Sequence, residues 1–332
     1  MEKIGVVGAG SFGTALAVML AKKGHDVTLT SHRAEQIEEL KRDRENKHYL
    51  PGVKLEENLK LTADYDEALD GTDVMLLAAP SSQFRTVFEH TVPYITDKTV
   101  IVNVAKGVEK PTLLRLSEVA HILRRDLKYV TLSGPSHAEE VGRFLPTTVV
   151  VSSEDMSAAE YIQDVFMTDR FRVYTNDDLC GVEMGGALKN IIALGAGISD
   201  GIGYGDNAKA ALMTRGIAEI TRLGVAVGAK PETFSGLTGY GDMIVTCTSM
   251  HSRNRRCGML IGEGVPPAEA VRQVGQVVEG IDITEAAYTV ARRRRIDMPI
   301  TECIYQCLQG EITAAETVGR LMNRDKKSEM GQ

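Results

Sequence analysis

The chain has 332 residues, of which 43% are hydrophobic and 25% charged, a composition that excludes a disordered or fibrous protein. At roughly 150 residues per domain, this length predicts about two domains with a cleft between them. The 38 Lys and Arg against 45 Asp and Glu give a formal net charge of −7, which argues against a nonspecific nucleic-acid coat or a binder of anionic membranes. Any site for an anion must therefore be a local cluster of cations.

The cysteines and the first residues indicate the cellular compartment. The five cysteines are odd in number and form no Cys-x-x-Cys pair, which predicts neither a disulfide framework nor a metal site and fits a reducing cytoplasm. The first residues lack the basic start and apolar core of a signal peptide, and no apolar run approaches about 18 residues. We therefore expect a cytoplasmic protein with no stable membrane association.

The first half of the chain alternates short apolar runs with helical patterns. A run at 3–8 precedes glycines and a helical pattern that ends near Gly24, and 27–30 predicts a second strand. Further runs typical of buried strands lie at 74–78, 99–104, 129–132 and 148–151. This alternation predicts an α/β fold with a mostly parallel, doubly wound sheet of the Rossmann type.

The pattern changes after about Asn176, where Ala, Leu, Gly and Glu recur at helical spacing. Helices are predicted within 183–198, 208–223 and 282–293. We expect a dinucleotide-binding domain over residues 1–180 and an all-helical substrate domain over 181–332. The arginine run 292–295 resembles a nuclear-localisation signal, but inside a helical pattern it more often marks a solvated helix end.

The glycines after the first predicted strand form the motif Gly8-Ala9-Gly10-Ser11-Phe12-Gly13. A strand before the motif and a helix after it indicate a dinucleotide site rather than a plain glycine turn. In such a site the first glycine permits the tight turn, the second lets a pyrophosphate approach the backbone, and the third allows close packing of helix on strand.

The residues at the end of the second predicted strand indicate which nicotinamide cofactor, NAD or NADP, the protein prefers. An NAD-specific site normally has Asp or Glu there, to accept from the ribose 2′-hydroxyl, whereas this chain has Thr30-Ser31-His32-Arg33. Arg33, helped by Ser31 and His32, can pair with a 2′-phosphate. We predict that NADP(H) is preferred and NAD(H) is accepted; in the alternative, Arg33 is a surface cation and either cofactor serves.

Cationic side chains elsewhere indicate a phosphorylated small substrate. Lys106 follows a predicted strand, and Lys189 lies in an apolar, glycine-rich helix, where an ammonium needs a partner or must reach water. The cluster 252–256 is the densest group of anion-binding donors, with a hydroxyl, an amide and three guanidiniums; a solvated basic loop is the alternative. His137, in a loop after a strand, is a weaker candidate for the acid or base.

Seven short motifs follow one another along both halves of the chain. They are Gly-Ala-Gly-Ser-Phe-Gly-Thr-Ala-Leu-Ala at 8–17, Val-Ala-Lys-Gly at 104–107, Ser-Gly-Pro-Ser at 133–136, Gly-Gly-Ala-Leu-Lys-Asn at 185–190, Thr-Arg-Gly at 214–216, Ser-Arg-Asn-Arg-Arg at 252–256 and Gly-Gln-Val-Val-Glu-Gly at 275–280. Together the motifs resemble those of the bacterial-type NAD(P)-dependent glycerol-3-phosphate dehydrogenases, although the family commonly has Trp or Tyr where this chain has Phe12.

The resemblance implies interconversion of dihydroxyacetone phosphate and sn-glycerol 3-phosphate, run toward the latter for glycerophospholipid synthesis. It also implies a helical domain of the 6-phosphogluconate-dehydrogenase type, with a homodimer as one option. Lys189 would be the proton donor and acceptor, and Thr246 would support the site. The implied substrate contacts are Lys106, Gly134, Ser136, Lys189, Asp242, Ser252, Arg253 and Asn254. The implied cofactor contacts are Gly8, Gly10, Ser11, Phe12, Gly13, His32, Arg33, Lys106, Ala138, Arg253, Val277 and Glu279.

Two alternatives stay open from the sequence. A sibling β-hydroxyacid or 6-phosphogluconate dehydrogenase also joins a dinucleotide fold to helices and uses a lysine, but its substrate carries a carboxylate. A redox sensor would bind NADPH and present the cationic clusters to a partner protein without catalysis.

Overall fold

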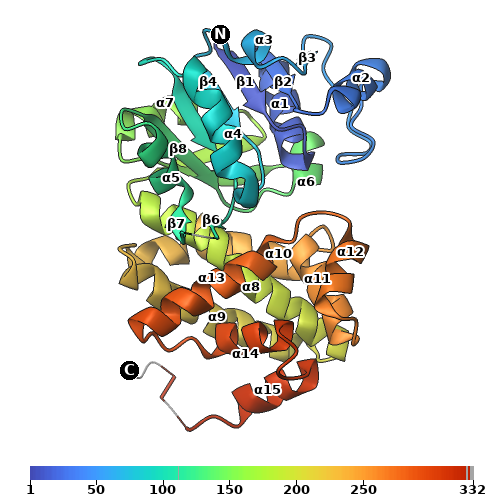
Figure 1. Ribbon diagram of the computed structural model, residues 1–332, viewed down its shortest axis with the longest axis vertical. Helices are drawn as coiled ribbons and strands as arrows, with labels where there is room; N and C mark the ends of the chain where they lie inside the picture. The colour runs from blue at the N-terminus through green and yellow to red at the C-terminus, as the bar shows by residue number, and fades with distance from the viewer. Residues whose placement is uncertain (111, 327, 330–332) are drawn as a thin grey trace. The chain divides into compact units, whose positions relative to one another are not determined.

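The computed structural model describes residues 1–110, 112–326 and 328–329 (Figure 1). The chain divides into two compact units, Met1–Ala187 with Gly224–Asp242, and Leu188–Leu223 with Met243–Gln332. The predicted boundary between residues 180 and 181 falls inside a single helix, α8 (Leu179–Ile202), and as a domain boundary it stays a prediction.

The first unit is built on an eight-stranded sheet in the order β10-β9-β8-β5-β4-β1-β2-β3. The strands are β1 (Lys3–Val7), β2 (Asp26–Thr30), β3 (Lys60–Thr62), β4 (Val74–Leu77), β5 (Val100–Asn103), β8 (Lys128–Ser133), β9 (Thr147–Ser152) and β10 (Phe171–Asn176). In this order, each pair of neighbouring strands from β8 through β5, β4, β1 and β2 to β3 is parallel, whereas β9 is antiparallel to β8. The doubly wound sheet is therefore confirmed, and the order of the strands reverses between β1 and β4.

The sequence did not predict two strands of this sheet, β3 and β10. It also did not predict a small separate hairpin. Strand β3 has three residues, and β10 alternates buried and exposed side chains at the sheet edge, so neither presents a continuous apolar run. Strands β6 (Val108–Glu109) and β7 (Leu114–Arg115) pair antiparallel as a separate hairpin.

Apolar side chains fill both faces of the sheet. On one face, residues such as Ile4 and Val6 join a core with helices α1 (Ser11–Lys23) and α7 (Met156–Phe166). On the other, residues such as Val7 and Met75 pack with α4 (Phe84–Thr91) and α5 (Leu116–Leu123). Since side chains alternate along a strand, runs that are apolar at every position are buried on both sides.

The remaining elements are helical. In the first unit they are α2 (Ala34–Asp43), α3 (Tyr65–Leu69), η1 (Ser81–Gln83), η2 (Val92–Tyr94), α6 (Ala138–Gly142), η3 (Pro231–Ser235) and the π-helical turn η4 (Leu237–Gly241). After α8 come α9 (Asp206–Ala226), α10 (Asp242–Thr248), α11 (Arg253–Gly262), α12 (Pro267–Val274), α13 (Glu279–Arg294), α14 (Pro299–Leu308) and α15 (Ala314–Met322). Beyond Asn176 the described residues include no strand, as predicted, and residues 292–295 are exposed at the end of α13.

In the second unit, glycines bring α8 and α11 into backbone contact. A methyl group built on Gly197 would lie 2.0 Å from the Arg255 carbonyl oxygen, and one built on Gly258 would lie 2.1 Å from that of Leu194. Side chains larger than hydrogen therefore cannot fit where these helices cross. The contact fixes the part of α8 that follows Lys189 against the helix that begins at Arg253.

Helix α8 is long and apolar enough to cross a membrane, by length and composition only. Of its apolar stretch, 94% is buried inside the protein. Such burial is typical of a helix at the centre of a globular protein's core.

Candidate active site

The glycine motif forms a tight turn between β1 and α1. Gly8 has a φ of +113°, and a methyl group on it would lie 2.7 Å from the carbonyl oxygen of Ala78, just past the end of β4. A methyl group on Gly13 would lie 2.1 Å from the Gly8 carbonyl oxygen, whereas one on Gly10 would meet nothing within 4 Å. The turn is thus closed at Gly8 and Gly13 and open at Gly10, which fits a pyrophosphate at the N-terminus of α1.

Two buried side-chain amides stabilise this turn by hydrogen bonds to its backbone. The Ala9 carbonyl oxygen accepts from Gln36 Nε2 at 2.7 Å and from Asn46 Nδ2 at 3.0 Å. The Asn46 amide also donates to the hydroxyl of Thr14 in α1. Sequence reasoning missed both side chains, because each lies in a polar stretch far along the chain from the glycines and carries no motif of its own.

The residues after β2 present a cation. His32 and Arg33 are exposed, while Ser31 is buried. Arg33 Nη2 donates to Gln36 Oε1 at 3.0 Å and to the Tyr49 hydroxyl at 3.1 Å. Within the described part of the chain no carboxylate pairs with Arg33, so its charge is available to an anion at the place where a ribose 2′-substituent is read.

A second group of predicted residues meets at the ends of β5 and β8. Lys106 Nζ donates to the Gly134 carbonyl oxygen at 2.9 Å and to Asp242 Oδ2 at 2.7 Å. The Ser136 hydroxyl donates to the same Gly134 oxygen. The side chains of Lys106 and Asp242 are only 16% and 3% exposed, so this is a largely desolvated ion pair. The resemblance implied that Asp242 contacts the substrate; the structure shows it paired with Lys106.

In the second unit, Lys189 is 5% exposed and its Nζ donates to Thr246 Oγ1 at 2.7 Å. The alternative in which this lysine extends into water is therefore wrong. Thr246 lies one helical turn after Asp242 on α10, so the same short helix supplies a partner to each lysine.

The N-terminus of α11 carries the predicted phosphate contacts. Ser252 caps the helix by accepting from the Arg255 backbone N–H at 3.2 Å, and Arg253 is exposed at the first helical position. The Asn254 amide donates to Asn190 Oδ1 at 2.8 Å and accepts from the Gly280 backbone N–H at 2.9 Å. Asn190, which the sequence left without a role, thus orients a predicted substrate residue.

One guanidinium of the cluster, that of Arg255, already has a carboxylate partner. Arg255 Nη2 lies 2.7 Å from Asp200 Oδ2, and Lys209 Nζ lies 2.8 Å from the other oxygen of that carboxylate. Arg255, which the sequence counted among the possible anion-binding donors, therefore pairs with a carboxylate from α8 that Lys209 shares.

The other predicted cofactor residues are divided between the units. Phe12 is partly buried in α1, and Ala138 begins α6. Val277 is 39% exposed and Glu279 begins α13. The roles of Arg253, Val277 and Glu279 toward the cofactor stay predictions.

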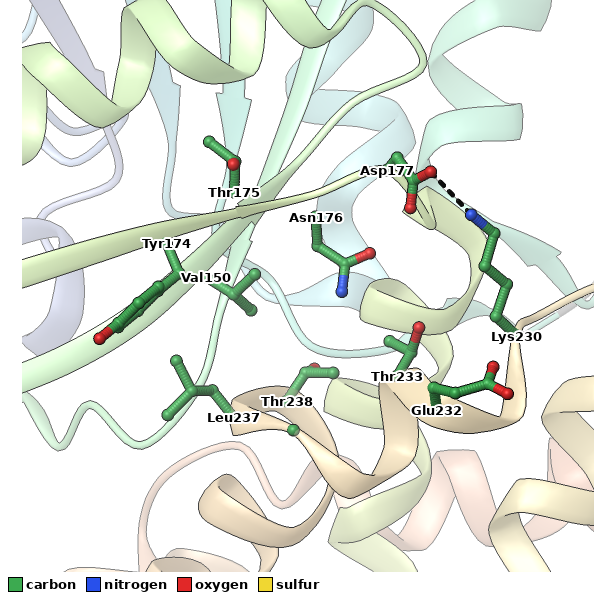
Figure 2. A pocket seen from close by; sticks show the side chains of 11 residues that line it. Val150, Tyr174, Thr175, Asn176, Asp177, Lys230, Glu232, Thr233, Leu237 and Thr238 are labelled. Atoms are coloured by element: carbon green, nitrogen blue, oxygen red, sulfur yellow. Dashed lines mark ion pairs between the residues drawn. The ribbon is translucent and has the colours of Figure 1, made fainter.

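A cavity of about 330 Å³ lies elsewhere in the first unit, where β10 ends beside η3 and η4 (Figure 2). Tyr174 and Leu237 face it, and the ion pair of Asp177 with Lys230, at 2.8 Å, lies at its side. It contains none of the predicted site residues, so no part of the reaction is assigned to it. Among the described residues no group of three His, Cys, Asp or Glu side chains is placed to hold a metal ion.

Comparisons with known proteins decide the family. The family model described as NAD-dependent glycerol-3-phosphate dehydrogenase N-terminus matches residues 3–159, and the corresponding C-terminus model matches 178–319. The glycerol-3-phosphate dehydrogenase [NAD(P)+] of Pelotomaculum thermopropionicum is 53% identical over 332 residues, covering 99% of this chain and 95% of that protein. The Bacillus subtilis enzyme of the same name is 52% identical over 335 residues, with coverage of 99% and 96%.

The chain belongs to the NAD-dependent glycerol-3-phosphate dehydrogenase family. It is accordingly an oxidoreductase with NAD(P)-dependent glycerol-3-phosphate dehydrogenase activity. The crystal structure of glycerol-3-phosphate dehydrogenase from Coxiella burnetii superposes with a TM-score of 0.92 at 39% identity, over 97% of this chain and 99% of that one.

More distant structures share the fold alone. The glycerol-3-phosphate dehydrogenase of Saccharomyces cerevisiae gives a TM-score of 0.83 at 23% identity, over 97% of this chain and 99% of that one. A D-mandelate dehydrogenase complex gives 0.62 at 14% identity, over 93% and 98%. At these identities the two structures show only a shared architecture, whereas the Coxiella burnetii enzyme resembles this chain in sequence as well.

Proposed function

We propose that the chain reduces dihydroxyacetone phosphate to sn-glycerol 3-phosphate, prefers NADPH to NADH, and supplies glycerophospholipid synthesis. Lys189 carries the proposal. Burying an ammonium costs free energy unless its hydrogens meet acceptors. The Lys189 ammonium lies on an apolar helix and donates to Thr246 Oγ1 at 2.7 Å. A ketone reduction needs one such group, because the oxygen of the ketone must gain a proton.

The first unit fits the cofactor. The turn from Gly8 to Gly13, with the N-terminus of α1, would bind the pyrophosphate, and Arg33 would bind the 2′-phosphate. When bound, NADPH supplies the hydride that reduces the ketone carbon.

The second unit supplies the grip on the substrate phosphate. The exposed guanidinium of Arg253 can bind a phosphate through two parallel hydrogen bonds. The N-terminus of α11, which begins at Arg253, adds backbone N–H groups and the positive end of the helix dipole. Asn254, oriented by Asn190, adds its backbone N–H.

The two lysines supply the charge that the transition state needs. Protonated Lys189 donates a hydrogen bond to the ketone oxygen and transfers its proton as the alkoxide forms, and in the reverse direction the neutral amine takes that proton back. Lys106 adds a second positive charge for the oxygen. Asp242 orients the Lys106 ammonium through the 2.7 Å contact and cannot itself stabilise the oxyanion.

The proposal is tested by initial rates of NADPH and NADH oxidation with dihydroxyacetone phosphate. We expect turnover with both nucleotides and a higher kcat/KM with NADPH. An absence of turnover above background with this ketone would overturn the substrate assignment and favour a sibling dehydrogenase or a sensor.

Replacing Arg33 tests the cofactor preference. Arg33→Ala should weaken NADPH binding by about 10- to 100-fold, the usual value of a charge-assisted hydrogen bond, and NADH binding much less. Titration calorimetry measures both, with Arg42→Ala as the control, since Arg42 lies on α2, the helix that Arg33 precedes, and pairs with Asp43. Equal losses for the two nucleotides would contradict the role in 2′-phosphate binding.

A further inference from the structure

One buried amide connects two parts of the cofactor site. Gln36, in the first turn of α2, is 9% exposed. Its Oε1 accepts from the Ser31 hydroxyl at 2.8 Å and from Arg33 Nη2 at 3.0 Å, while its Nε2 donates to the Ala9 carbonyl oxygen at 2.7 Å. Because a carbonyl can only accept and a guanidinium can only donate, the network fixes which way the amide points.

The contacts of Gln36 restrict a side chain that would otherwise move freely. Arg33 is exposed, and a long exposed arginine loses side-chain entropy when it grips an anion. Here the guanidinium is already held, by Gln36 and by the Tyr49 hydroxyl at 3.1 Å. An arginine oriented before the ligand arrives binds the ligand more tightly.

The same amide also sets a spacing. In an adenine dinucleotide, the ribose fixes the distance between the pyrophosphate and the 2′-phosphate. The Ala9 carbonyl belongs to the glycine turn, and Arg33 and Ser31 follow β2. A single side chain bonded to all three therefore holds the region for one phosphate in register with the region for the other.

We propose that Gln36 is a positioning residue for 2′-phosphate recognition, acting through Arg33. This inference rests on the proposed preference for NADPH. It assigns to Gln36 no contact with the ligand; the residue acts by keeping the guanidinium donors of Arg33 where a phosphate needs them.

The experiment measures binding of two nucleotide fragments that carry no nicotinamide. Titration calorimetry with adenosine 2′,5′-bisphosphate and with 5′-AMP gives the affinity ratio that the 2′-phosphate creates. The proteins are the wild type, Gln36→Met, Arg33→Ala and the double variant. Methionine keeps the length of the side chain but offers no donor and only a weakly accepting sulfur, and Asn46 still holds Ala9 in that variant.

We expect the wild type to bind the bisphosphate about 10- to 100-fold more tightly than 5′-AMP, and Gln36→Met to reduce that ratio about tenfold. With Arg33 already replaced by alanine, Gln36→Met should leave the ratio nearly unchanged, because residues that act as a unit are not additive. Glu39→Gln, on the exposed side of α2, is the control and should keep the wild-type ratio.

Gln36→Glu provides a second variant that keeps an acceptor for Arg33. Its negative charge would oppose a 2′-phosphate, so the bisphosphate should lose more affinity than 5′-AMP. Thermal melting confirms that each variant is folded.

The outcomes separate the two claims. A wild-type ratio near one would overturn the 2′-phosphate role of Arg33, and the role of Gln36 with it. A ratio lost in Arg33→Ala but kept in both Gln36 variants would overturn the role of Gln36 alone. So would equal losses for the two fragments in Gln36→Met, which would mean that Gln36 only supports the glycine turn.

Discussion

At the scale of single residues, the candidate site is defined by how its charges are held. Lys106 lies between a carbonyl oxygen and Asp242, and Lys189 lies against Thr246. Taking an ammonium out of water is unfavourable unless its hydrogens meet acceptors. Each partner is therefore as much a part of the site as the lysine that it holds.

The pairing of Lys106 with Asp242 makes a prediction about stability. Asp242→Asn should lower the free energy of unfolding by about 3 kcal/mol, because it leaves a desolvated ammonium without its counter-charge. The double variant Lys106→Met/Asp242→Leu should lose less than the single one. Urea unfolding measures both, with Asp26→Asn as the control, since its partner Lys60 is 58% exposed and such pairs contribute little. A double variant that loses as much stability as Asp242→Asn, or more, would contradict the coupling.

His25 makes a prediction about pH. Its Nδ1 accepts from the Glu2 backbone N–H at 3.1 Å, and its Nε2 lies 3.1 Å from the Val165 carbonyl oxygen, an arrangement that requires the neutral ring. Burial lowers the pKa of His25 below its ordinary value, which is about 6.5. Since the folded pKa is the lower one, the contribution of His25 to stability is complete above about pH 6.5 and is lost as the pH falls through the folded pKa.

The measurement compares unfolding free energies of wild type and His25→Gln between pH 5 and 8, the range over which histidine ordinarily titrates. The advantage of the wild type should shrink as the pH is lowered. An advantage that is constant, or that grows toward acid, would mean that the ring is not held neutral.

At the scale of elements, the close crossing of α8 and α11 sets the geometry of the second unit. Gly258→Ala should lower the free energy of unfolding by about 3 kcal/mol, since the added methyl group meets a backbone oxygen at 2.1 Å that cannot move aside cheaply. Gly319→Ala is the matched control. A methyl group there meets nothing within 4 Å, so this substitution in α15 should be neutral or stabilising. Similar effects of the two substitutions would contradict the close packing.

At this scale, the strands that carry a clear local sequence pattern were predictable. The six predicted strands agree with the structure to within one residue at each end, because they are buried on both faces and read as continuous apolar runs. Strand β10 escaped because it lies at the edge of the sheet and exposes Arg172 and Tyr174. Strand β3 escaped because three residues carry too little pattern.

At the scale of the whole molecule, the chain passes between the two units more than once. It leaves the first unit along α8, returns at Gly224 and leaves again after Asp242. A change of composition along the sequence shows only the first of these crossings. For the same reason Asp242 looked like part of the helical half, although it belongs with Lys106, which lies 136 residues earlier.

Motifs revealed the site residues that are contiguous in sequence, and not those that support them. Gln36 and Asn46 hold Ala9 across 27 and 37 residues, and contacts of that length leave no local signature. A cytoplasmic location and a homodimer stay predictions, as does the use of the product for glycerophospholipid synthesis.

The role of Lys189 is tested most directly by replacing it with methionine. We measure the initial rate of NADPH oxidation with dihydroxyacetone phosphate, and NADPH affinity by calorimetry, with Lys230→Met as a control that removes an exposed lysine outside the site. The rate of Lys189→Met should fall by about 100-fold or more, while NADPH affinity stays at the wild-type value. If the variant keeps most of the wild-type rate, Lys189 is not the proton donor.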